Sequence, residues 1–410
     1  MDRKITPVLL GGDLNAYSMA LAFFDAIGCI SHVFSRERLA LTDTSSFIIT
    51  HKVKELDNPN IAVPCLLNFA DEHSNEILML IPCADWYVEM LEYASDVLSE
   101  KYFFFIPDFE VWRAVSDKAS FAAIMSKYSV NYPKTEIFDS RMQDFEKKCR
   151  NLKPPFVVKP ADSSEYWRHA FENMKKVYFA HSIGEAMMIA RAIFFSGYSG
   201  KLLVQEYVGD EKAPQSSVLT VFCDSGGKAV AAVLADILLE EISPTARGNY
   251  SAVITRPLND ISHRLISMLE SIGYTGIANF DIVTQDGKDY CLELNPRQGR
   301  CSDYILAANI NLAEFFISVL KGEKYSDRFV YPEILWRCVS KRTMRRYAPE
   351  IPLAMKADAL EKSGRSYTPY KGRGDMGIRR RAYVMAHLYR QGKCYKKFSS
   401  GKQSPSGVNA

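Results

Sequence analysis

The sequence predicts a protein of mixed α/β and α+β class, built from an N-terminal parallel α/β domain and a second α+β domain. Over residues 1–105, short apolar segments alternate with segments of helical periodicity, which is typical of βαβ units. From about residue 118, apolar segments pair across glycine-rich turns, which indicates antiparallel hairpins. The 410 residues are enough for about two to four domains with full-sized cores.

Composition excludes several classes of protein. Hydrophobic residues make up 47% of the chain and charged residues 24%, which is typical of globular proteins and not of collagen, coiled coils or disordered chains. No apolar run approaches the roughly 18–20 residues that span a bilayer, and the apolar start of the chain is too short for a signal peptide. Nine cysteines without zinc or redox spacing indicate free thiols, so we expect a cytoplasmic protein.

Charge is distributed unevenly along the chain. The net charge is +3, but residues 331–410 hold 18 basic and 5 acidic residues, whereas the first 330 hold 33 basic and 43 acidic. A basic end of this kind can attract an anionic substrate, contact an anionic membrane surface peripherally, or form a solvated helix face. We expect no nucleic-acid partner, and the sequence does not predict an oligomeric state.

The N-terminal domain is predicted to span residues 1–110. An apolar strand at 5–10 is followed by Gly11-Gly12-Asp13 and a helix that ends at Gly28, and further strands are expected at 46–50 and 77–83. The two glycines do not complete a dinucleotide-binding fingerprint, so we expect a structural turn there.

The second domain is predicted to span residues 111–330. It contains expected helices at 117–128 and 261–272, strands at 156–160 and 201–208, and hairpins that turn at 224–228 and within 277–295. Residues 331–396 form a basic extension, and the Ser/Gly-rich residues 397–410 are expected to be a disordered tail.

The hairpin at 277–295 carries the most informative polar residues. Glu293 and Asn295 are two apart on one strand and therefore share a face. Asp281 on the partner strand joins them if the turn has three residues, but a two-residue Asp286-Gly287 turn would place Glu293 on the opposite face.

Two carboxylates and an amide on one patch suit Mg²⁺, which binds one or two carboxylates together with nucleotide phosphates. The alternative is a solvated polar face of the sheet. Arg297 and Arg300 follow directly in the segment NPRQGR, and guanidinium groups bind phosphate or carboxylate oxygens in a bidentate manner. This neighbourhood favours phosphate chemistry over a plain polar surface.

The segments NFD and ELNPR resemble the metal-binding hairpin of ATP-grasp ligases, and other landmarks of that family follow in the same order. The resemblance covers about residues 100–325 and implies an ATP-grasp fold after a Rossmann-like domain. It assigns Lys118 and Lys159 to the ATP phosphates, Glu206 and the backbone around Val208 to adenine, and Glu211 to the ribose, with Asp210 as an alternative.

The resemblance also implies ATP and Mg²⁺ as cofactors. Asp281, Glu293 and Asn295 would hold Mg²⁺ against the phosphates, and Arg297, with Arg300 beside it, would act as the catalytic arginine that stabilises the transferred phosphoryl group. Enzymes of this family mostly activate a carboxylate as an acyl phosphate, which an amine then attacks.

Three longer segments, KPADSSEYW, ARGNYSAVI and ELNPRQGRCS, resemble the D-aspartate ligases of cell-wall synthesis within that family. This implies D-aspartate as the small-molecule amino acid and the lysine amine of an anionic UDP-linked muramyl pentapeptide as the acceptor. The alternatives are a different carboxylate–amine ligase, such as a dipeptide or small-metabolite synthetase, and a nucleotide-binding protein without catalysis. The amino-acid pocket is not predicted.

Overall fold

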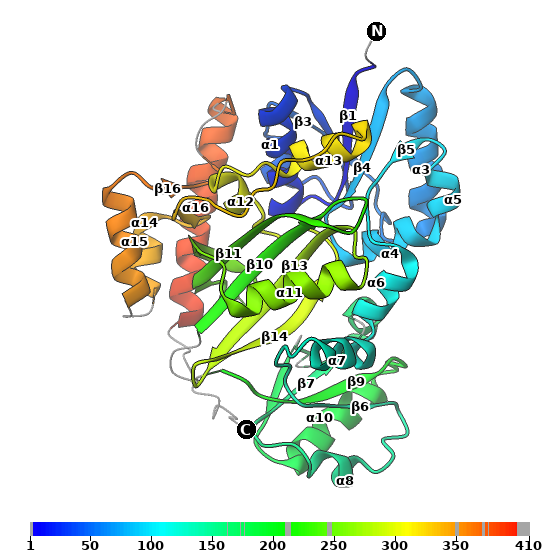
Figure 1. Cartoon of the computed structure of the whole chain (residues 1–410), viewed down its shortest axis with the longest axis vertical. Coiled ribbons are helices and arrows are strands. Elements are labelled where there is room, and N and C mark those ends of the chain that lie inside the picture. Colours follow the sequence, from blue (N-terminus) through cyan, green and yellow to red (C-terminus); the bar gives the residue numbers. More distant parts are fainter. Residues whose placement is uncertain are drawn as a thin grey trace.

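Three sheets organise the described part of the chain (Figure 1). The structure is a computed structural model that describes residues 3–161, 163–172, 174–175, 177–209, 215–243, 248–348, 352–370, 374–375 and 377–399. In Figure 1 the N-terminal sheet lies at the top, the largest sheet in the centre and the smallest at the bottom. The mixed α/β and α+β class predicted from the sequence is confirmed.

The N-terminal sheet is parallel throughout, as the alternating pattern predicts. Its order is β3-β2-β1-β4-β5, with strands β1 (Ile5–Leu10), β2 (Ser31–Ser35), β3 (Ile48–Lys52), β4 (Ile77–Pro82) and β5 (Tyr102–Phe103). Strands β1 and β4 are apolar and almost entirely buried, as expected when helices cover both faces of a parallel sheet. The helices of this part are α1 (Leu14–Ile27), α2 (Ala40–Asp43), α3 (Pro59–Glu72), α4 (Asp85–Tyr93) and α5 (Ser95–Leu98).

The turn after β1 is structural, because both glycines lie against neighbouring chain. A Cβ on Gly11 would lie 3.1 Å from the Cβ of Cys83, and one on Gly12 would lie 2.9 Å from that of Ser35. The side chain of Asp13 then caps α1 by accepting a hydrogen bond from the backbone N–H of Asn15 (3.1 Å). The turn thus places a carboxylate at the carboxyl edge of the sheet, where ligands of open α/β sheets bind.

The smallest sheet is antiparallel and has the order β6-β9-β7-β8. Its central strand β7 alternates buried and half-buried residues, so Lys159 lies on the face opposite Val158. Val158 packs with Ala190 and Ile193 in the core beneath the sheet. The elements are β6 (Thr135–Phe138), α8 (Phe145–Cys149), β7 (Phe156–Pro160), α9 (Ser163–Arg168), β8 (Tyr178–Ala180), α10 (Ile183–Phe195) and β9 (Leu202–Glu206).

The central sheet has the order β14-β13-β10-β11-β12-β15-β16 and separates two cores. Leu219 and Val221 face α11, whereas Val218 and Phe222 belong to the core shared with α13 and α1. The elements are α6 (Phe109–Ser116), α7 (Lys118–Lys127), β10 (Gln215–Cys223), β11 (Ala229–Glu240), β12 (Tyr250–Arg256), α11 (Asp260–Ser271), β13 (Gly276–Gln285), β14 (Lys288–Asn295), α12 (Asp303–Ala307) and α13 (Leu312–Lys321).

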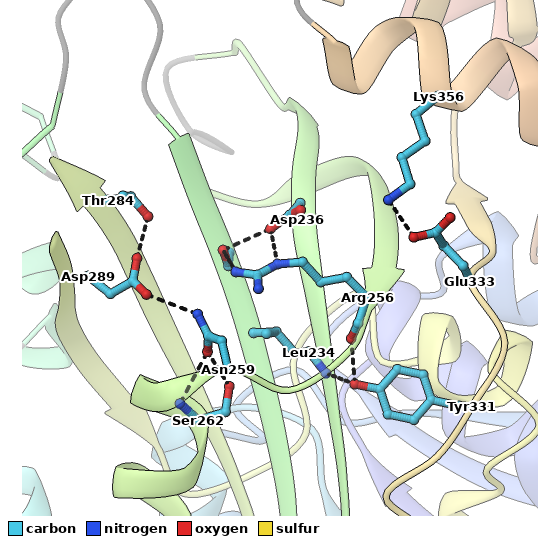
Figure 2. Close-up of polar contacts among 11 residues, drawn as sticks. Leu234, Asp236, Arg256, Asn259, Ser262, Thr284, Asp289, Tyr331, Glu333 and Lys356 are labelled. Atoms are coloured by element: carbon cyan, nitrogen blue, oxygen red, sulfur yellow. Dashed lines mark hydrogen bonds and ion pairs between the residues drawn. The ribbon is translucent and has the colours of Figure 1, made fainter. Parts of the chain in front are cut away.

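Polar contacts tie α11 and the segment after α13 to this sheet (Figure 2). Asn259 caps α11 by accepting from the backbone N–H of Ser262 (3.3 Å), and its amide donates to Asp289 (3.0 Å) of the neighbouring hairpin. Tyr331 donates to the carbonyl of Arg256 and accepts from the N–H of Leu234, both at 2.8 Å. These contacts tie the segment after α13 to the sheet.

The chain beyond residue 330 continues the central sheet. Strands β15 (Leu335–Arg337) and β16 (Ser366–Tyr367) extend its edge next to β12. Between these two strands the chain forms α14 (Lys341–Tyr347) and α15 (Pro352–Lys362), and α16 (Ile378–Ser399) follows β16. Helix α16 includes residues 397–399 of the segment expected to be a tail, and residues 400–410 lie outside the described residues. The domain boundaries at 110 and 330 stay predictions.

No helix within the described ranges has the length and apolar character to cross a membrane. All nine cysteines are free thiols, as their spacing predicts.

Candidate active site

The hairpin formed by β13 and β14 brings Asp281, Glu293 and Asn295 to one face. It does so through a combination of turn and bulge that the sequence did not predict. The turn is the two-residue form, with Asp286 (φ 51°) and Gly287 (φ 71°) both left-handed. Pairing continues regularly to Ile282 and Cys291, and then Leu292 forms a bulge.

Because of this bulge, Asp281 pairs with Glu293 and Asn279 pairs with Asn295. A bulge places two residues opposite one and so changes the face that the following residues occupy. The expectation that a two-residue turn would separate Glu293 from Asp281 was therefore wrong, since it assumed an unbroken ladder. The two carboxylates are direct cross-strand neighbours.

Tyr250 and Lys118 contact these carboxylates. Tyr250, at the start of β12, donates its hydroxyl hydrogen bond to Oδ1 of Asp281. Burial and the neighbouring carboxylates of Asp281 and Glu293 raise the pKa of Tyr250 well above its ordinary value, so it remains a donor. Lys118 Nζ lies 4.0 Å from Oε2 of Glu293.

The donor set fits Mg²⁺ bound jointly with phosphates. No group of three or more His, Cys, Asp or Glu side chains suited to a metal occurs among the residues that the structure describes. Two carboxylates with an amide oxygen, supplemented by nucleotide phosphates, are the ligands that Mg²⁺ uses in such sites. The same pair would be an incomplete site for zinc, which is usually held by four nitrogen or sulfur ligands in structural sites.

The residues predicted to contact the nucleotide lie on or beside α7, β7 and β9. Helix α7 begins at Lys118, and Asp117 caps it by accepting from the N–H of Ser120 (2.8 Å). Lys159 extends from β7, and Val208 follows the end of β9 at Glu206. The Glu206 carboxylate accepts from the N–H of Lys153 (2.9 Å), so this side chain is already engaged with backbone.

The segment after β9 contacts the carboxylate hairpin, since the N–H of Gly209 donates to Oε1 of Gln285 (3.2 Å). This contact joins the segment predicted to contact adenine to the hairpin predicted to hold the metal. Glu211 and Asp210, predicted for the ribose, lie outside the described residues, as does Arg247 of the segment ARGNYSAVI.

Arg297 lies just beyond the carboxylates and points to the N-terminal sheet. Its Nη2 is 2.8 Å from Oδ2 of Asp85 and 3.5 Å from Oδ1 of Asn295, and its Nη1 donates to the carbonyl of Gln298 (3.0 Å). Its Nε is buried without a hydrogen-bond partner among the described residues. Burial acts to lower the pKa of Arg297, but Asp85, Asp13 and Asp281 raise it overall.

Arg300 lies between two carboxylates from distant segments. Its Nη1 contacts Oε1 of Glu241, directly after β11, and its Nε is 3.5 Å from Oδ2 of Asp13. Burial raises the pKa of Asp13, and Arg300 and Arg297 oppose that rise. The site therefore contains two guanidinium groups. It also contains the carboxylates of Asp13 and Glu241, in addition to the pair predicted to bind a metal.

Buried amides hold this end of the hairpin against the N-terminal domain. Asn15 donates to the carbonyls of Cys83 (3.0 Å) and Gln298 (3.1 Å), and Gln298 donates to the carbonyl of Pro82 (3.0 Å). The carboxyl ends of β1 and β4 are thereby fixed beside Arg297.

Four residues of this site were not predicted to belong to it: Asp13, Asp85, Glu241 and Tyr250, of which Tyr250 lies in the segment ARGNYSAVI. Asp85 follows β4, and the rule that parallel strands present their carboxyl ends at one edge could have placed it beside Asp13. No local signal places Glu241 beside Arg300 or Tyr250 beside Asp281, because their positions depend on the pairing of β11 with β12.

Comparison with known proteins agrees with this architecture. Residues 115–299 match the ATP-grasp domain family. In fold, the chain is similar to the biotin carboxylase domain of Hydrogenobacter thermophilus 2-oxoglutarate carboxylase, solved with MgADP and bicarbonate (TM-score 0.59, 15% identity, 78% of this chain and 71% of that one). It is also similar to Staphylococcus aureus N5-carboxyaminoimidazole synthetase, solved with ADP (TM-score 0.58, 13% identity, 82% of each chain).

Residues 115–299 thus form an ATP-grasp domain, and the comparisons support an ADP-forming carboxylate–amine ligase. Among proteins of known activity, the chain is similar along most of its length to the D-aspartate ligase of Enterococcus faecium (strain Aus0004). The two are 29% identical over 397 residues, which cover 92% of this chain and 93% of the relative.

Proposed function

We propose that this protein uses Mg-ATP to activate the β-carboxylate of D-aspartate and joins it to the lysine amine of a UDP-linked muramyl pentapeptide, with release of ADP and phosphate. The observation that carries the proposal is the pairing of Asp281 with Glu293 beside Asn295 and Arg297, in a chain that resembles a D-aspartate ligase. The use of ATP and of a nucleotide-linked acceptor assigns the reaction to the cytoplasm.

ATP is proposed to bind between the smallest sheet and the carboxylate hairpin. Lys118 and Lys159 would neutralise phosphate charge, and the backbone near Val208 would contact adenine. Asp281, Glu293 and Asn295 would hold Mg²⁺, which when bound shields the charge on the phosphates. The 4.0 Å separation of Lys118 from Glu293 supports this placement, since cation and carboxylate would share the same phosphates.

The proposed chemistry has two steps. A carboxylate oxygen of the amino acid attacks the γ-phosphorus, the bond from that phosphorus to the bridging oxygen breaks, and ADP leaves. The amine then attacks the carbonyl carbon of the acyl phosphate, the C–O bond breaks, phosphate leaves and the nitrogen loses one proton to solvent. Arg297 is positioned to stabilise negative charge in the first step, because it lies within 3.5 Å of Asn295 at the proposed metal site.

We assign the amino-acid pocket to Arg300 with Asp13 and Glu241. A free amino acid carries a carboxylate and an ammonium group, and it therefore needs both a cation and an anion in its site. Arg300 supplies the cation, and the two carboxylates that contact it supply the anions. When an amino acid enters, its carboxylate can pair with Arg300 and its ammonium group with the carboxylates that Arg300 leaves. The buried charges therefore stay paired on binding.

Mass-resolved turnover tests the proposal. Purified protein with Mg-ATP is incubated with D-aspartate, L-aspartate, D-alanine or D-glutamate, each with and without the muramyl pentapeptide precursor, and ADP and product masses are measured. We expect ADP only with D-aspartate and precursor together, and a mass gain of one aspartyl residue.

Turnover with another amino acid or amine would keep the ligase chemistry and replace the substrates, as for a dipeptide or small-metabolite synthetase. Absence of ADP with every pair, despite measurable ATP binding, would instead favour a nucleotide-binding protein without catalysis.

A further inference from the structure

Helix α16 is held rigidly by its inner face. Arg380 is buried, pairs with Asp375 (3.1 Å), and its guanidinium carbon lies 4.3 Å from the centre of the Tyr17 ring in the N-terminal domain. Near the other end, Tyr395 is buried and donates to Oγ of Ser251 (2.8 Å) of the central sheet. The helix is therefore fixed to two other parts of the molecule along its length.

The outer face of α16 exposes a stripe of large apolar side chains. Ile378 is 88% exposed, Met385 is 68% exposed and Tyr389 is 64% exposed. Spacings of seven and four residues place all three on one side of a helix. The exposed residues Ala382 and Ala386 lie on the same side, so the centre of this face contains little that is polar.

Cations flank the stripe on both sides. Arg379 and Arg390 lie along one edge and Arg381 along the other, with Lys393 one turn beyond Tyr389, and all four are exposed. None of the four forms an ion pair with a carboxylate in the described ranges, and the sequence of α16 contains no Asp or Glu. We call these four cations with the stripe Ile378, Met385 and Tyr389 the α16 face.

The neighbouring helix α14 also carries exposed cations. It packs against α16, and its residues Arg342 and Arg346 are exposed. Figure 1 shows α14, α15 and α16 together at one side of the molecule, away from the smallest sheet with Lys159 and Glu206. The α16 face is therefore separate from the proposed nucleotide site.

We propose that the α16 face docks on the surface of an anionic membrane, with the helix lying in the plane of the headgroups. A helix binds at such an interface when an apolar stripe enters the acyl boundary and basic residues beside it contact anionic headgroups. About 33 Å of helix is available at 1.5 Å per residue. Because its inner face is already fixed, no chain ordering is needed on binding.

The arrangement favours a membrane over other partners. A nucleic acid would use the cations but would leave Ile378 and Met385 facing phosphates. A second copy docked through the same face would oppose like charges, since a two-fold interface brings the same patch together twice. Acidic protein partners would match the charge, and they are separated from lipid by the test below.

Vesicle co-sedimentation of the full chain tests this inference. The vesicles contain phosphatidylcholine alone or phosphatidylcholine with 30% phosphatidylglycerol, at low salt and at 0.5 M NaCl. We expect binding to the anionic vesicles only, and release at high salt, because screening weakens the attraction of exposed charges.

Two variants locate the contact on α16. Arg379→Gln with Arg381→Gln should weaken binding roughly thirtyfold, at about 1 kcal/mol for each basic residue near an anionic membrane surface. Met385→Ser should weaken it about tenfold through lost apolar burial. ADP formation should be unchanged in both variants, since Arg379, Arg381 and Met385 are all exposed on the outer face of α16, away from the proposed nucleotide site.

Matched controls make the same chemical changes elsewhere on the surface. Lys54→Gln with Lys147→Gln removes two exposed charges, and Phe195→Ser removes a 95% exposed apolar side chain at the end of α10. These controls should bind anionic vesicles like the unaltered protein. Equal losses in controls and α16 variants, equal binding to neutral vesicles, or no binding to any vesicle would overturn the proposal. Tighter binding to duplex DNA or RNA than to anionic vesicles at the same salt would overturn it in favour of a nucleic acid.

Discussion

Glu293 is the side chain on which the proposed phosphoryl transfer depends most, because it faces Asp281 directly and Lys118 from the nucleotide side. Replacing Glu293 with Gln removes one of two carboxylates from the metal site. We expect ADP formation to fall by about a thousandfold or more, since the charge stabilisation supplied by a bound metal is worth several kcal/mol. The fold should be retained, because the substitution preserves shape. Steady-state ADP release and circular dichroism measure the two effects.

Asp286→Asn is the matched control for this prediction. It makes the same carboxylate-to-amide change at the exposed tip of the same hairpin, and asparagine tolerates the left-handed backbone found there (φ 51°). Near-normal turnover by the Glu293 variant, or an equal loss in the Asp286 variant, would contradict the metal assignment.

Individual site residues were predictable where chemistry and local spacing coincide. Glu293, Asn295 and Arg297 follow one another at strand spacing, so their shared neighbourhood could be inferred from sequence. Asp281 could be placed only conditionally, since its face depended on the turn and on a bulge. Glu241 and Tyr250 could not be found, because their contacts with Arg300 and Asp281 arise from strand pairing between distant segments.

Helix α7 positions Lys118, and its start depends on the cap supplied by Asp117. Asp117→Ala should destabilise the first turn by about 1 kcal/mol. If Lys118 binds ATP phosphate, this loosening should raise the KM for ATP severalfold with a smaller change in kcat. Asp117→Asn should restore the KM, since asparagine caps helices as well as aspartate does.

The same cap at another helix serves as the control for Asp117. Asn259 caps α11, and its amide contacts Asp289 of the β13–β14 hairpin (Figure 2). Asn259→Ala should lower stability by a similar amount and leave the KM for ATP unchanged. A KM change of equal size in both variants would show that general destabilisation, and not the position of Lys118, is responsible.

Elements with strong local signals were predicted closely. The expected helix at 117–128 corresponds to α7 at Lys118–Lys127, and the expected strand at 156–160 is β7. The bulge at Leu292 had no such signal, because it is a property of the pairing between β13 and β14 and not of either strand alone. Turn chemistry alone therefore gave an incomplete account of the register.

At the scale of the whole molecule, three distant segments meet around the buried side chain of Asp303. This residue of α12 is 1% exposed, and Ser18 of α1 and Trp336 of β15 lie beside it. Burial raises the pKa of Asp303 to about 7, and Trp336 and Ser18 oppose that rise. Helix α1 beside the N-terminal sheet, helix α12 and strand β15 of the central sheet thus meet at one carboxyl group, a contact that the sequence did not predict.

This carboxyl group makes stability depend on pH in a definite direction. Below the ordinary pKa of 3.8 it is protonated in both the folded and the unfolded chain. Between pH 3.8 and about 7 only the unfolded chain releases the proton, so the free energy of unfolding falls as pH rises. Above pH 7 the carboxyl group is ionised in both states, so the free energy of unfolding falls no further. The total loss is roughly 4 kcal/mol, at 1.36 kcal/mol for each pKa unit.

Asp303→Asn removes the titration while keeping the shape of the side chain. The quantity of interest is the free energy of unfolding of the variant minus that of the unaltered protein. We expect this difference to be larger at pH 8 than at pH 5, by up to a few kcal/mol. The measurement is urea-induced unfolding of both proteins at pH 5, 6, 7 and 8, and the difference between them cancels the titration of all other groups. A difference that is constant with pH would show that Asp303 is ionised in the folded protein, and that the junction of the three parts holds a charged carboxylate.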